Sequence, residues 1–196
     1  PIIAKLFELV IFYLCSDQLL SDDLQFGFKS KIGCANAVFA LRTTIDYFKD
    51  RGGTVYGAAL DISKAFDKVN HLKLFEALAE SRLPNWILII LANWYCKLNV
   101  AVRWKGVLSI SFGVKSGVRQ GSTLSPSLFN VFINLFIIKL RELGIGCHVG
   151  DVFLGCILYA DDIILLSGSV DGLQSMLNCC YAVSSNLKLS FNCTKS

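Results

Sequence analysis

The sequence predicts an α+β fold in which a split β-α-β antiparallel sheet is backed by helices. Two observations predict it. Short β-prone runs and longer helical segments follow one another in the order strand, helices, hairpin, helix, strand. In the longer segments apolar residues recur at helical spacing, whereas the strand-like segments are short apolar runs. The chain of 196 residues has the length of a single domain and can bury a sizeable core.

The first half of the chain is expected to be mainly helical, with one strand. Apolar spacing indicates the helices, and a turn with two glycines separates the second helix from the strand. Asn70 can cap the helix that follows, and Pro84 can open the next. The expected elements are a helix within residues 2–20, a loop at 25–31, a helix at 35–48, a turn at 50–53, a strand at 54–60 and two helices after Asn70 and Pro84. In the last helix one stripe is expected from Trp86, Ile90, Trp94 and Leu98.

The second half is expected to contain two hairpins, two helices and a final strand. Lys105 and Gly106 between apolar runs indicate the first hairpin. Ser125 followed by Pro126 indicates a helix start, with Ser as the N-cap and Pro as the first helical residue. The expected elements are strands at 100–104 and 107–114, a loop at 116–123, a helix at 127–143 that ends at Gly144, strands at 153–159 and 163–167, a helix at 172–185 and a strand at 187–192.

Composition bears on membrane and nucleic-acid partners. The hydrophobic content is 54% and the mean hydropathy is +0.54. The most apolar stretches, residues 1–15, 86–95 and 128–140, are all interrupted by charged or Asn residues. None provides the roughly 18 unbroken apolar residues of a spanning helix, so we expect buried core elements and no membrane partner. The net charge of +4 permits a polyanionic partner, but the pI of about 8.7 does not by itself indicate one.

Eight cysteines are present, and none forms a Cys-x-x-Cys pair. Because no secretion signal opens the chain, we expect all eight to be reduced and most to be buried as small hydrophobes. The chain begins with Pro1, and its single methionine is Met176. The sequence is therefore expected to be a fragment of a longer protein.

The strongest functional signal is a pair of adjacent carboxylates, Asp161 and Asp162, inside the apolar run ILYADDIILL at 157–166. A hairpin would place both at its tip, outside the core. One interpretation is turn chemistry alone, because turns favour Asp. The other is that a cation neutralises the two charges, and Mg²⁺ is typically bound by one or two carboxylates together with substrate phosphates.

A further carboxylate, Asp61, follows the predicted strand at 54–60. A sheet that sets this strand beside the hairpin would bring Asp61 next to Asp161. Such a pair can hold two Mg²⁺ about 4 Å apart and clamp both the attacking and the leaving oxygen of an in-line phosphoryl transfer.

Five segments together resemble one known family, the reverse transcriptases of non-LTR (long interspersed element) retrotransposons. Residues 61–66 (DISKAF), 116–126 (SGVRQGSTLSP) and 159–162 (YADD) are similar to its motifs A, B and C. QFGF at 25–28 resembles the fingers motif, and LKLSFNCTK at 187–195 resembles motif D. The similarity covers essentially the whole chain in the family's order. It implies a polymerase palm with partial fingers, and RNA-templated DNA synthesis by two-metal nucleotidyl transfer from a dNTP to a primer 3′-hydroxyl.

The resemblance also implies roles for single residues. Asp61, Asp161 and Asp162 match the metal-binding aspartates, which implies two Mg²⁺ ions as cofactors, with Mn²⁺ as a substitute. Phe66 matches the steric gate that excludes the 2′-hydroxyl of a ribonucleotide. Without the resemblance, Phe66 is more simply a core residue, because Phe is usually buried.

Further positions match substrate-binding or proton-donating residues of the family. Tyr159 matches the aromatic residue near the primer end, and Arg119, Gln120 and Gly121 match a loop along the nucleotide and template. Lys29 and Lys31 stand where many relatives carry arginine, so the bidentate fork is lost there. Lys195 matches the lysine that protonates the pyrophosphate leaving group. From the residues alone, a half-buried strand end for Tyr159 and solvated loops for Arg119 and Lys29 stay open.

The resemblance implies a division into partial fingers at residues 1–53 and palm at 54–196, which carries motifs A to D. The expected partners are an RNA template, a DNA primer and dNTPs. We expect the thumb to be absent from this chain and to belong, with an endonuclease region, to the full-length protein. That protein is expected to be intracellular, in the nucleus.

Two other functions stay open. An RNA-dependent RNA polymerase shares the chemistry, but Phe66 argues against it, because such an enzyme must admit the 2′-hydroxyl. A non-catalytic nucleic-acid-binding remnant of a retroelement is the alternative from another class, since a fold can outlive its activity.

Overall fold

A computed structural model describes residues 2–119 and 121–194 of the chain. The predicted α+β class is confirmed, with helices packed on a three-stranded antiparallel sheet. The helices are α1 (Ile2–Cys15), α2 (Cys34–Lys49), α3 (His71–Glu80), α4 (Asn85–Cys96), α5 (Ser125–Glu142) and α6 (Val170–Leu187). The main sheet contains β1 (Tyr56–Asp61), β8 (Cys156–Tyr159) and β9 (Asp162–Ser167). Shorter strands are β2 (Asn99–Val100), β3 (Arg103–Trp104), β4 (Val107–Leu108), β5 (Phe112–Gly113), β6 (His148–Val149) and β7 (Val152–Phe153).

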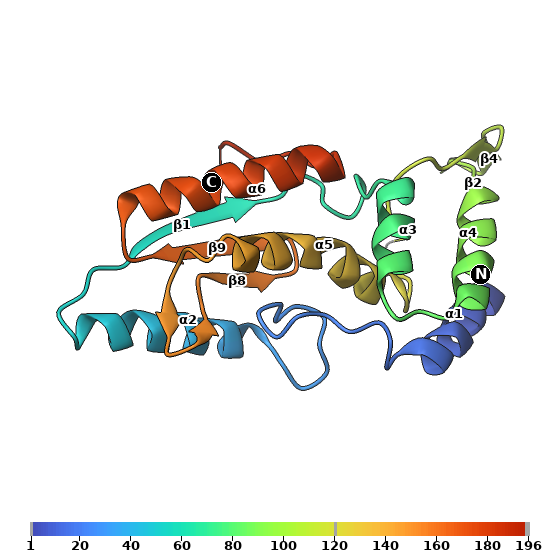
Figure 1. Cartoon of the computed structure of the whole chain (residues 1–196). Helices are drawn as coiled ribbons and strands as arrows, with labels where there is room; N and C mark the ends of the chain where they lie inside the picture. The colour runs from blue at the N-terminus through green and yellow to red at the C-terminus, as the bar shows by residue number, and fades with distance from the viewer. Residues whose placement is uncertain (1, 120, 195–196) are drawn as a thin grey trace.

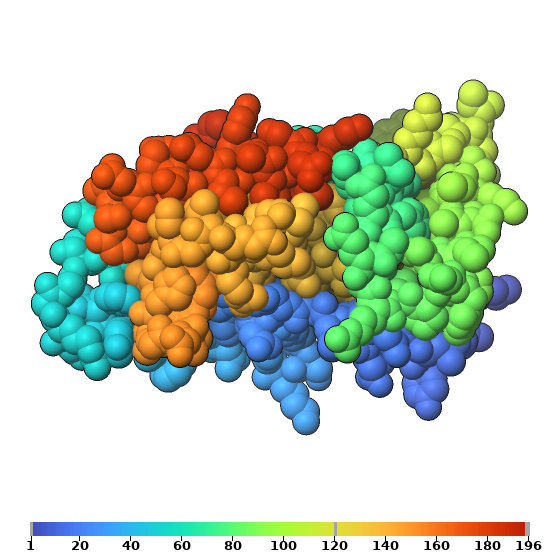
Figure 2. Space-filling model, in the orientation of Figure 1, coloured from blue at the N-terminus to red at the C-terminus, as the bar shows by residue number. Residues whose placement is uncertain are grey.

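The main sheet has the order β1-β9-β8, so the last strand of the hairpin lies in the middle. Tyr56 pairs with Ser167 at one end of the β1–β9 ladder, and Asp61 pairs with Asp162 at the other. Helix α6 packs on β1 and β9, whereas α2 contacts β8 from the other side (Figure 1). Figure 2 shows the same order at the surface, with the C-terminal helix along one edge and the N-terminal segments along the opposite edge. The hairpin strands β8 and β9 are therefore covered on both faces, whereas β1 stays partly exposed.

Alternate residues of β9 enter two different apolar clusters. Ile163 and Leu165 join the main core with α5 and α6, whereas Leu166 joins a smaller cluster with Ala37 of α2. Successive side chains of a strand point to opposite faces, so a sheet covered on both faces is apolar at every position. The long apolar run of β9 that was noted in the sequence follows from this placement.

Helix α5 starts differently from the prediction. Ser125 is already helical, and the N-cap is Leu124. The Ser122 hydroxyl instead accepts hydrogen bonds from the backbone N–H groups of Leu124 and Ser125, both at 3.3 Å. The prediction that Ser125 is the N-cap is wrong, because the chain enters the helix one residue earlier and a serine three residues upstream satisfies the exposed donors.

The predicted strand at 187–192 is also wrong. Helix α6 continues to Leu187, and Lys188 ends it in the left-handed conformation, with φ of 59°. In the described part of the chain, one bridge remains of the expected ladder, between Ile62 and Phe191. The Asn192 N–H donates to the carbonyl of Asp61 at 2.8 Å, so this segment lies along the end of β1 without forming a strand.

Other predicted elements agree with the structure except in detail. The first hairpin turns at Lys105 and Gly106, both with positive φ, and Asn70 caps α3 by accepting from the N–H of Lys73. In α4 the buried stripe is shifted by one residue from the prediction and consists of Ile87, Leu91 and Tyr95. Apart from Asn85 and Asn93 the helix is apolar, so spacing alone could not tell which stripe faces the core.

Two further observations concern composition. The eight cysteines are free thiols, of which Cys15, Cys147, Cys156 and Cys180 are buried, so half rather than most of them lie in the core. Among the helices in residues 2–119 and 121–194, none has the length and hydropathy needed to span a membrane.

Candidate functional site

The two-residue turn between β8 and β9 forms one wall of the candidate site. Tyr159 pairs with Asp162, which leaves Ala160 and Asp161 in the turn. Ala160 has the left-handed φ of 57° that such a hairpin requires. Strand β1 lies beside β9, and the N–H of Ile62 donates to the Asp161 carbonyl at 3.3 Å. The adjacency of Asp61 and the hairpin, predicted from the sequence, is therefore present.

Asp61 and Asp161 line one open cavity of about 460 Å³. The other polar side chains on its wall are Lys64, Lys68 and Asn192. Carboxylates from the end of one strand and from a neighbouring turn thus face a common space with two ammonium groups beside it. This arrangement can receive a substrate that carries phosphates, because the cations attract it and the carboxylates can hold a metal bound to it.

Asp162 lies on the other side of the sheet edge. It lines a second, largely apolar cavity of about 240 Å³ together with Tyr159 and Cys34 of α2, and Asp61 reaches both cavities. In the part of the chain that the structure describes, no three His, Cys, Asp or Glu side chains are grouped so that they could hold one metal ion. Asp161 and Asp162 thus line different cavities, because successive residues around the start of a strand point to opposite faces.

Asp61 is held by the segment after α6, which the sequence did not indicate. The Asn192 side-chain amide donates to Asp61 Oδ2 at 3.1 Å. On the same segment, Ser190 accepts a hydrogen bond from the Lys68 ammonium at 2.6 Å. The segment that resembles motif D thus fixes both a carboxylate and a lysine of the cavity wall. Lys195, predicted to protonate the leaving group, lies outside the described residues.

Phe66 is half-buried in the turn that follows β1. Its ring stacks on Phe129 of α5, with centroids 4.5 Å apart and planes at 17°. The ring of Phe28 meets it edge-on at 5.6 Å. One face of Phe66 is therefore committed to the core, as the simpler interpretation expected, and the ring is still partly accessible for contact with a sugar.

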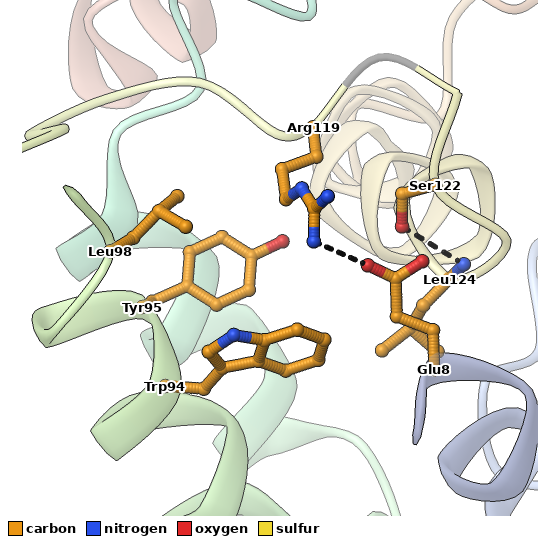
Figure 3. A pocket seen from close by; sticks show the side chains of 7 residues that line it. All are labelled: Glu8, Trp94, Tyr95, Leu98, Arg119, Ser122 and Leu124. Atoms are coloured by element: carbon orange, nitrogen blue, oxygen red, sulfur yellow. Dashed lines mark hydrogen bonds and ion pairs between the residues drawn. The ribbon is translucent and has the colours of Figure 1, made fainter. Parts of the chain in front are cut away.

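The loop that resembles motif B is tied to the first helix (Figure 3). Glu8 of α1 is buried, and it accepts hydrogen bonds from the Arg119 guanidinium at 3.1 Å and from the N–H of Thr123 at 3.0 Å. The Tyr95 hydroxyl points toward Arg119 in Figure 3, and burial raises the pKa of Tyr95 to about 12. Arg119 thus anchors its own loop and does not line the cavity of Asp61 and Asp161.

The other predicted substrate-binding residues are placed as follows. Gly121 has φ of 74°, and the space where a Cβ would lie is open, so a ligand can approach its backbone closely. Gln120 lies outside the described residues. Lys29 donates to the Asp22 carbonyl at 2.6 Å, and burial lowers the pKa of its ammonium. Tyr159 is half-buried and packs beside the cluster under α2, away from the larger cavity.

Comparison with known proteins identifies the class of this domain. The family profile described as Reverse transcriptase (RNA-dependent DNA polymerase) matches residues 6–196. The solved structure of a telomerase from Candida tropicalis in complex with a TWJ fragment of telomeric RNA superposes with a TM-score of 0.69 and 16% identity, covering 95% of this chain and 32% of the telomerase chain. A likeness at this identity concerns the fold. The profile match covers nearly all of the sequence, and the chain therefore belongs to the reverse transcriptase family.

Curated relatives narrow the assignment. A Pol polyprotein of the type-1 retrotransposable element R2 from Nasonia vitripennis is 34% identical over 163 residues, or 81% of this chain and 15% of the polyprotein. The R2DM polyprotein of Drosophila melanogaster is 30% identical over 157 residues, or 80% of this chain and 15% of the polyprotein. The domain is thus of the non-LTR retrotransposon type, as its motifs indicated. The chain spans about 15% of the length of these two relatives.

Proposed function

We propose that this domain synthesises DNA on an RNA template, transferring a nucleotidyl group from a dNTP to the 3′-hydroxyl of a primer with two divalent metal ions. The observation that carries the proposal is the cavity shared by Asp61, at the end of β1, and Asp161, in the turn between β8 and β9. A single structural carboxylate in a turn needs no such partner. Two carboxylates facing one open, cation-lined space match a phosphoryl-transfer site.

The donors of this cavity fit Mg²⁺, for which Mn²⁺ can substitute. They are oxygens of two carboxylates, with an amide group beside them, and hard divalent cations prefer such oxygen ligands. Asp61 and Asp161 would hold the metal ions, and Asp162 would complete the set only after turning from the second cavity. When bound, the metal ions would neutralise phosphate charge and favour the attacking alkoxide.

The remaining work is done by the chain's own residues. Lys64 and Lys68 on the cavity wall would bind the triphosphate as point charges. Phe66, stacked on Phe129, would meet the deoxyribose with its accessible edge and exclude a 2′-hydroxyl.

Further residues would contact substrate from outside this cavity. Gln120 and Gly121 would follow the nucleotide and template, and Tyr159 would contact the primer end. Arg119 would contact substrate only after leaving Glu8. Lys29 would bind substrate only after leaving the Asp22 carbonyl, and Lys195 would donate the proton to pyrophosphate.

The test is primer extension on an RNA template by the full-length protein. Asp61→Asn and Asp161→Asn should each nearly abolish extension in Mg²⁺. Asp151→Asn is a matched control, because Asp151 is exposed between β6 and β7, and it should leave extension unchanged. Extension by Asp161→Asn at the wild-type rate would refute the assignment. A wild-type protein that binds primer–template but extends it in neither Mg²⁺ nor Mn²⁺ would support the non-catalytic alternative.

Nucleotide choice separates the remaining alternative. A reverse transcriptase should prefer dNTPs to rNTPs, whereas an RNA-dependent RNA polymerase should show the reverse preference.

The likeness to retrotransposon proteins also supports our proposal that the full-length protein acts inside the cell, in the nucleus. The RNA template, the DNA primer and the dNTPs would be its substrates there.

A further inference from the structure

A loop from the N-terminal part of the chain, residues 25–28, lies directly under the turn that carries Asp161. Gln25 in this loop is completely buried. Its Oε1 accepts hydrogen bonds from the N–H of Gly27 at 2.8 Å and from the N–H of Ala160 at 3.1 Å. Its Nε2 donates to the carbonyl of Ala160 at 3.3 Å. One side chain therefore binds both polar backbone groups of the residue before Asp161.

The backbone of the same segment is paired with β8. The N–H of Leu158 donates to the Leu24 carbonyl, and the N–H of Phe26 donates to the Leu158 carbonyl, both at 2.8 Å. A Cβ on Gly27 would lie 2.4 Å from the nitrogen of Ala160, so only glycine permits this approach. From the other side, the Asn130 side-chain amide of α5 donates to the Gly27 carbonyl at 2.9 Å. The loop is thus fixed between the turn and a core helix.

The turn needs these hydrogen bonds because its backbone conformation is unfavourable for alanine. Ala160 holds a left-handed φ of 57°, which alanine adopts at a cost, because its Cβ crowds the following carbonyl. Two N–H donors and one carbonyl acceptor must be matched by a single buried group, and a side-chain amide offers both functions. Because the two donors must meet an oxygen, the orientation of the Gln25 amide is also determined. Replacing it would leave buried backbone groups unpaired at the turn.

The loop reaches a second point of the site through Phe28. This residue also has a positive φ, of 58°, and about half of its surface is exposed. Its ring contacts that of Phe66, which stacks on Phe129, with the Phe28 and Phe66 centroids 5.6 Å apart and their planes at 85°. The loop thus touches both the carboxylate turn and the aromatic residue proposed to face the sugar.

We propose that residues 25–28 form a positioning clamp, in which Gln25 sets the place of Asp161 and Phe28 sets the place of Phe66. The inference rests on the proposed polymerase function and adds two positioning residues to it. Neither contacts the reacting atoms. Gln25 governs the rate of the chemical step, because the carboxylate must be held to within about an ångström, and Phe28 governs the discrimination between sugars.

The first test measures dNTP incorporation by the full-length protein with Gln25→Met and Gln25→Glu. Gln25→Met keeps the shape but loses all three hydrogen bonds, and kcat should fall roughly ten- to hundred-fold with KM changed much less, as expected for a small displacement of a catalytic group. Gln25→Glu keeps the acceptor for the two N–H groups and should recover part of kcat. Ile87→Val is the control for lost stability, because Ile87 is buried in α4. If Ile87→Val lowers Tm as much as Gln25→Met does, its kcat should still equal the wild-type value.

The second test uses Phe28→Leu and the ratio of kcat/KM for a dNTP to that for the matching rNTP. Phe28→Leu should lower the ratio several-fold, whereas Gln25→Met should leave it unchanged. A general loss of folding would move both readouts together in both variants. Wild-type kcat in folded Gln25→Met and Gln25→Glu, or a wild-type ratio in Phe28→Leu, would overturn the clamp. Failure of the polymerase assignment is distinct, because the wild-type protein itself would then be inactive, or Asp161→Asn would be fully active.

Discussion

The position of Asp161 is unfavourable for the stability of the fold but favourable for binding a cation. It lies in a two-residue turn, faces the cavity that Asp61 also lines, and brings a second negative charge to that space. Two like charges that face one space repel each other. The metal ions proposed for this cavity would offset that repulsion, whereas turn geometry alone gives no reason for the second charge.

Asp161→Asn should therefore leave Tm unchanged or slightly raised while extension is lost. Asparagine tolerates the same turn, and the substitution relieves repulsion with Asp61. Mg²⁺ should raise the Tm of the wild-type protein, since a ligand that binds only the folded state stabilises it, and should raise that of the variant less. A loss of stability of roughly 1–3 kcal/mol with extension intact would instead mean that the carboxylate makes a structural hydrogen bond.

Phe66 belongs partly to the core and partly to the site, so its substitution should show both effects. Phe66→Val removes the ring that stacks on Phe129 and should cost about 1–3 kcal/mol of stability, because the site is only half-buried. The same change should raise the kcat/KM for rNTPs relative to dNTPs, since a smaller side chain leaves room for the 2′-hydroxyl. Phe136→Leu is a control in the same helix layer, fully buried, and should lower stability without moving the ratio. An unmoved ratio in Phe66→Val would make Phe66 a core residue only.

At the scale of elements, two ion pairs attach the N-terminal segments to the palm. Glu8 of α1 pairs with Arg119, and Asp22 accepts from Arg141 of α5 through two hydrogen bonds, at 2.6 and 3.0 Å. The first pair is buried on the carboxylate side, with Glu8 at 3% and Arg119 at 33% side-chain exposure. The two partners should therefore differ in what their removal costs.

Arg119→Met should destabilise the protein more than Glu8→Gln. Losing the arginine leaves a buried carboxylate without its counter-charge, which costs about 3–5 kcal/mol when a buried pair is broken from one side. Losing the carboxylate leaves only a partly solvated guanidinium, and glutamine can still accept from Thr123. The double variant should be more stable than Arg119→Met alone. Urea unfolding of the four proteins gives this cycle, and strictly additive losses would contradict a direct pair.

The Asp22–Arg141 pair should appear in the pH dependence of stability. Burial alone would raise the pKa of Asp22, but the hydrogen bonds from Arg141 and from the N–H of Leu24 outweigh it, so the pKa lies below its ordinary value. A lowered pKa in the folded state means that the stabilisation is fully present above the unfolded pKa, about 4, and is lost as the pH falls through the folded pKa.

Asp22→Asn should accordingly cost about 1 kcal/mol of the free energy of unfolding at pH 7, and the difference from wild type should shrink below about pH 4. Asp46→Asn is the matched control, because the Arg42–Asp46 pair is exposed on both sides and 3.5 Å long. It should show almost no difference from wild type at either pH. A pH-independent gap between Asp22→Asn and wild type would assign the effect to lost hydrogen bonding rather than to the charge.

Local signals predicted the elements better than the contacts between them. Three features that depend only on short stretches of sequence are present in the structure. They are the cap at Asn70, the turn at Lys105–Gly106 and the hairpin formed by the apolar runs around Ala160. The prediction of a strand at 187–192 was wrong because α6 extends to Leu187 and Lys188 takes a left-handed conformation, which changes the direction of the chain. The pairing of Asp61 with the hairpin followed from sheet topology. The opposite facing of Asp162 could have been anticipated from strand alternation.

Contacts between residues far apart in sequence could not be predicted from local patterns. Gln25 and Ala160 are 135 residues apart, and Glu8 and Arg119 are 111 apart. Glu8 offered one signal, since it is one of only two charged residues, with Lys5, in the otherwise apolar α1, and a buried charge requires a partner. Nothing in the sequence said which of the cations that partner would be. The resemblance to motif B assigned Arg119 to substrate, and it gave no indication that Arg119 pairs with Glu8.

On the scale of the whole molecule, much of the surface is apolar rather than basic. Helix α1 exposes Ile2, Ile3, Leu6 and Tyr13, and the first hairpin exposes Val102, Trp104 and Ile110. Among residues 2–119 and 121–194, the cations on the cavity wall are Lys64 and Lys68. Affinity for nucleic acid comes mainly from cations that displace counterions from phosphates, and two cations make a small footprint.

Residues 1–196 by themselves should therefore bind an RNA–DNA primer–template weakly. Each phosphate contact contributes a slope of about −0.9 to the dependence of log K on log[salt]. Two or three contacts at the cavity would give a slope of about −2 to −3, against steeper values for an extended footprint. Fluorescence anisotropy over a salt range of about 50 to 200 mM tests this slope. Replacing Lys64 and Lys68 together by Ala should reduce the slope by about two. Replacing Lys49 and Lys188, which do not line the cavity, should not.

Tight binding with processive extension by this chain alone would contradict this prediction. It would show that the surface of this chain, rather than further parts of the full-length protein, holds the nucleic acid.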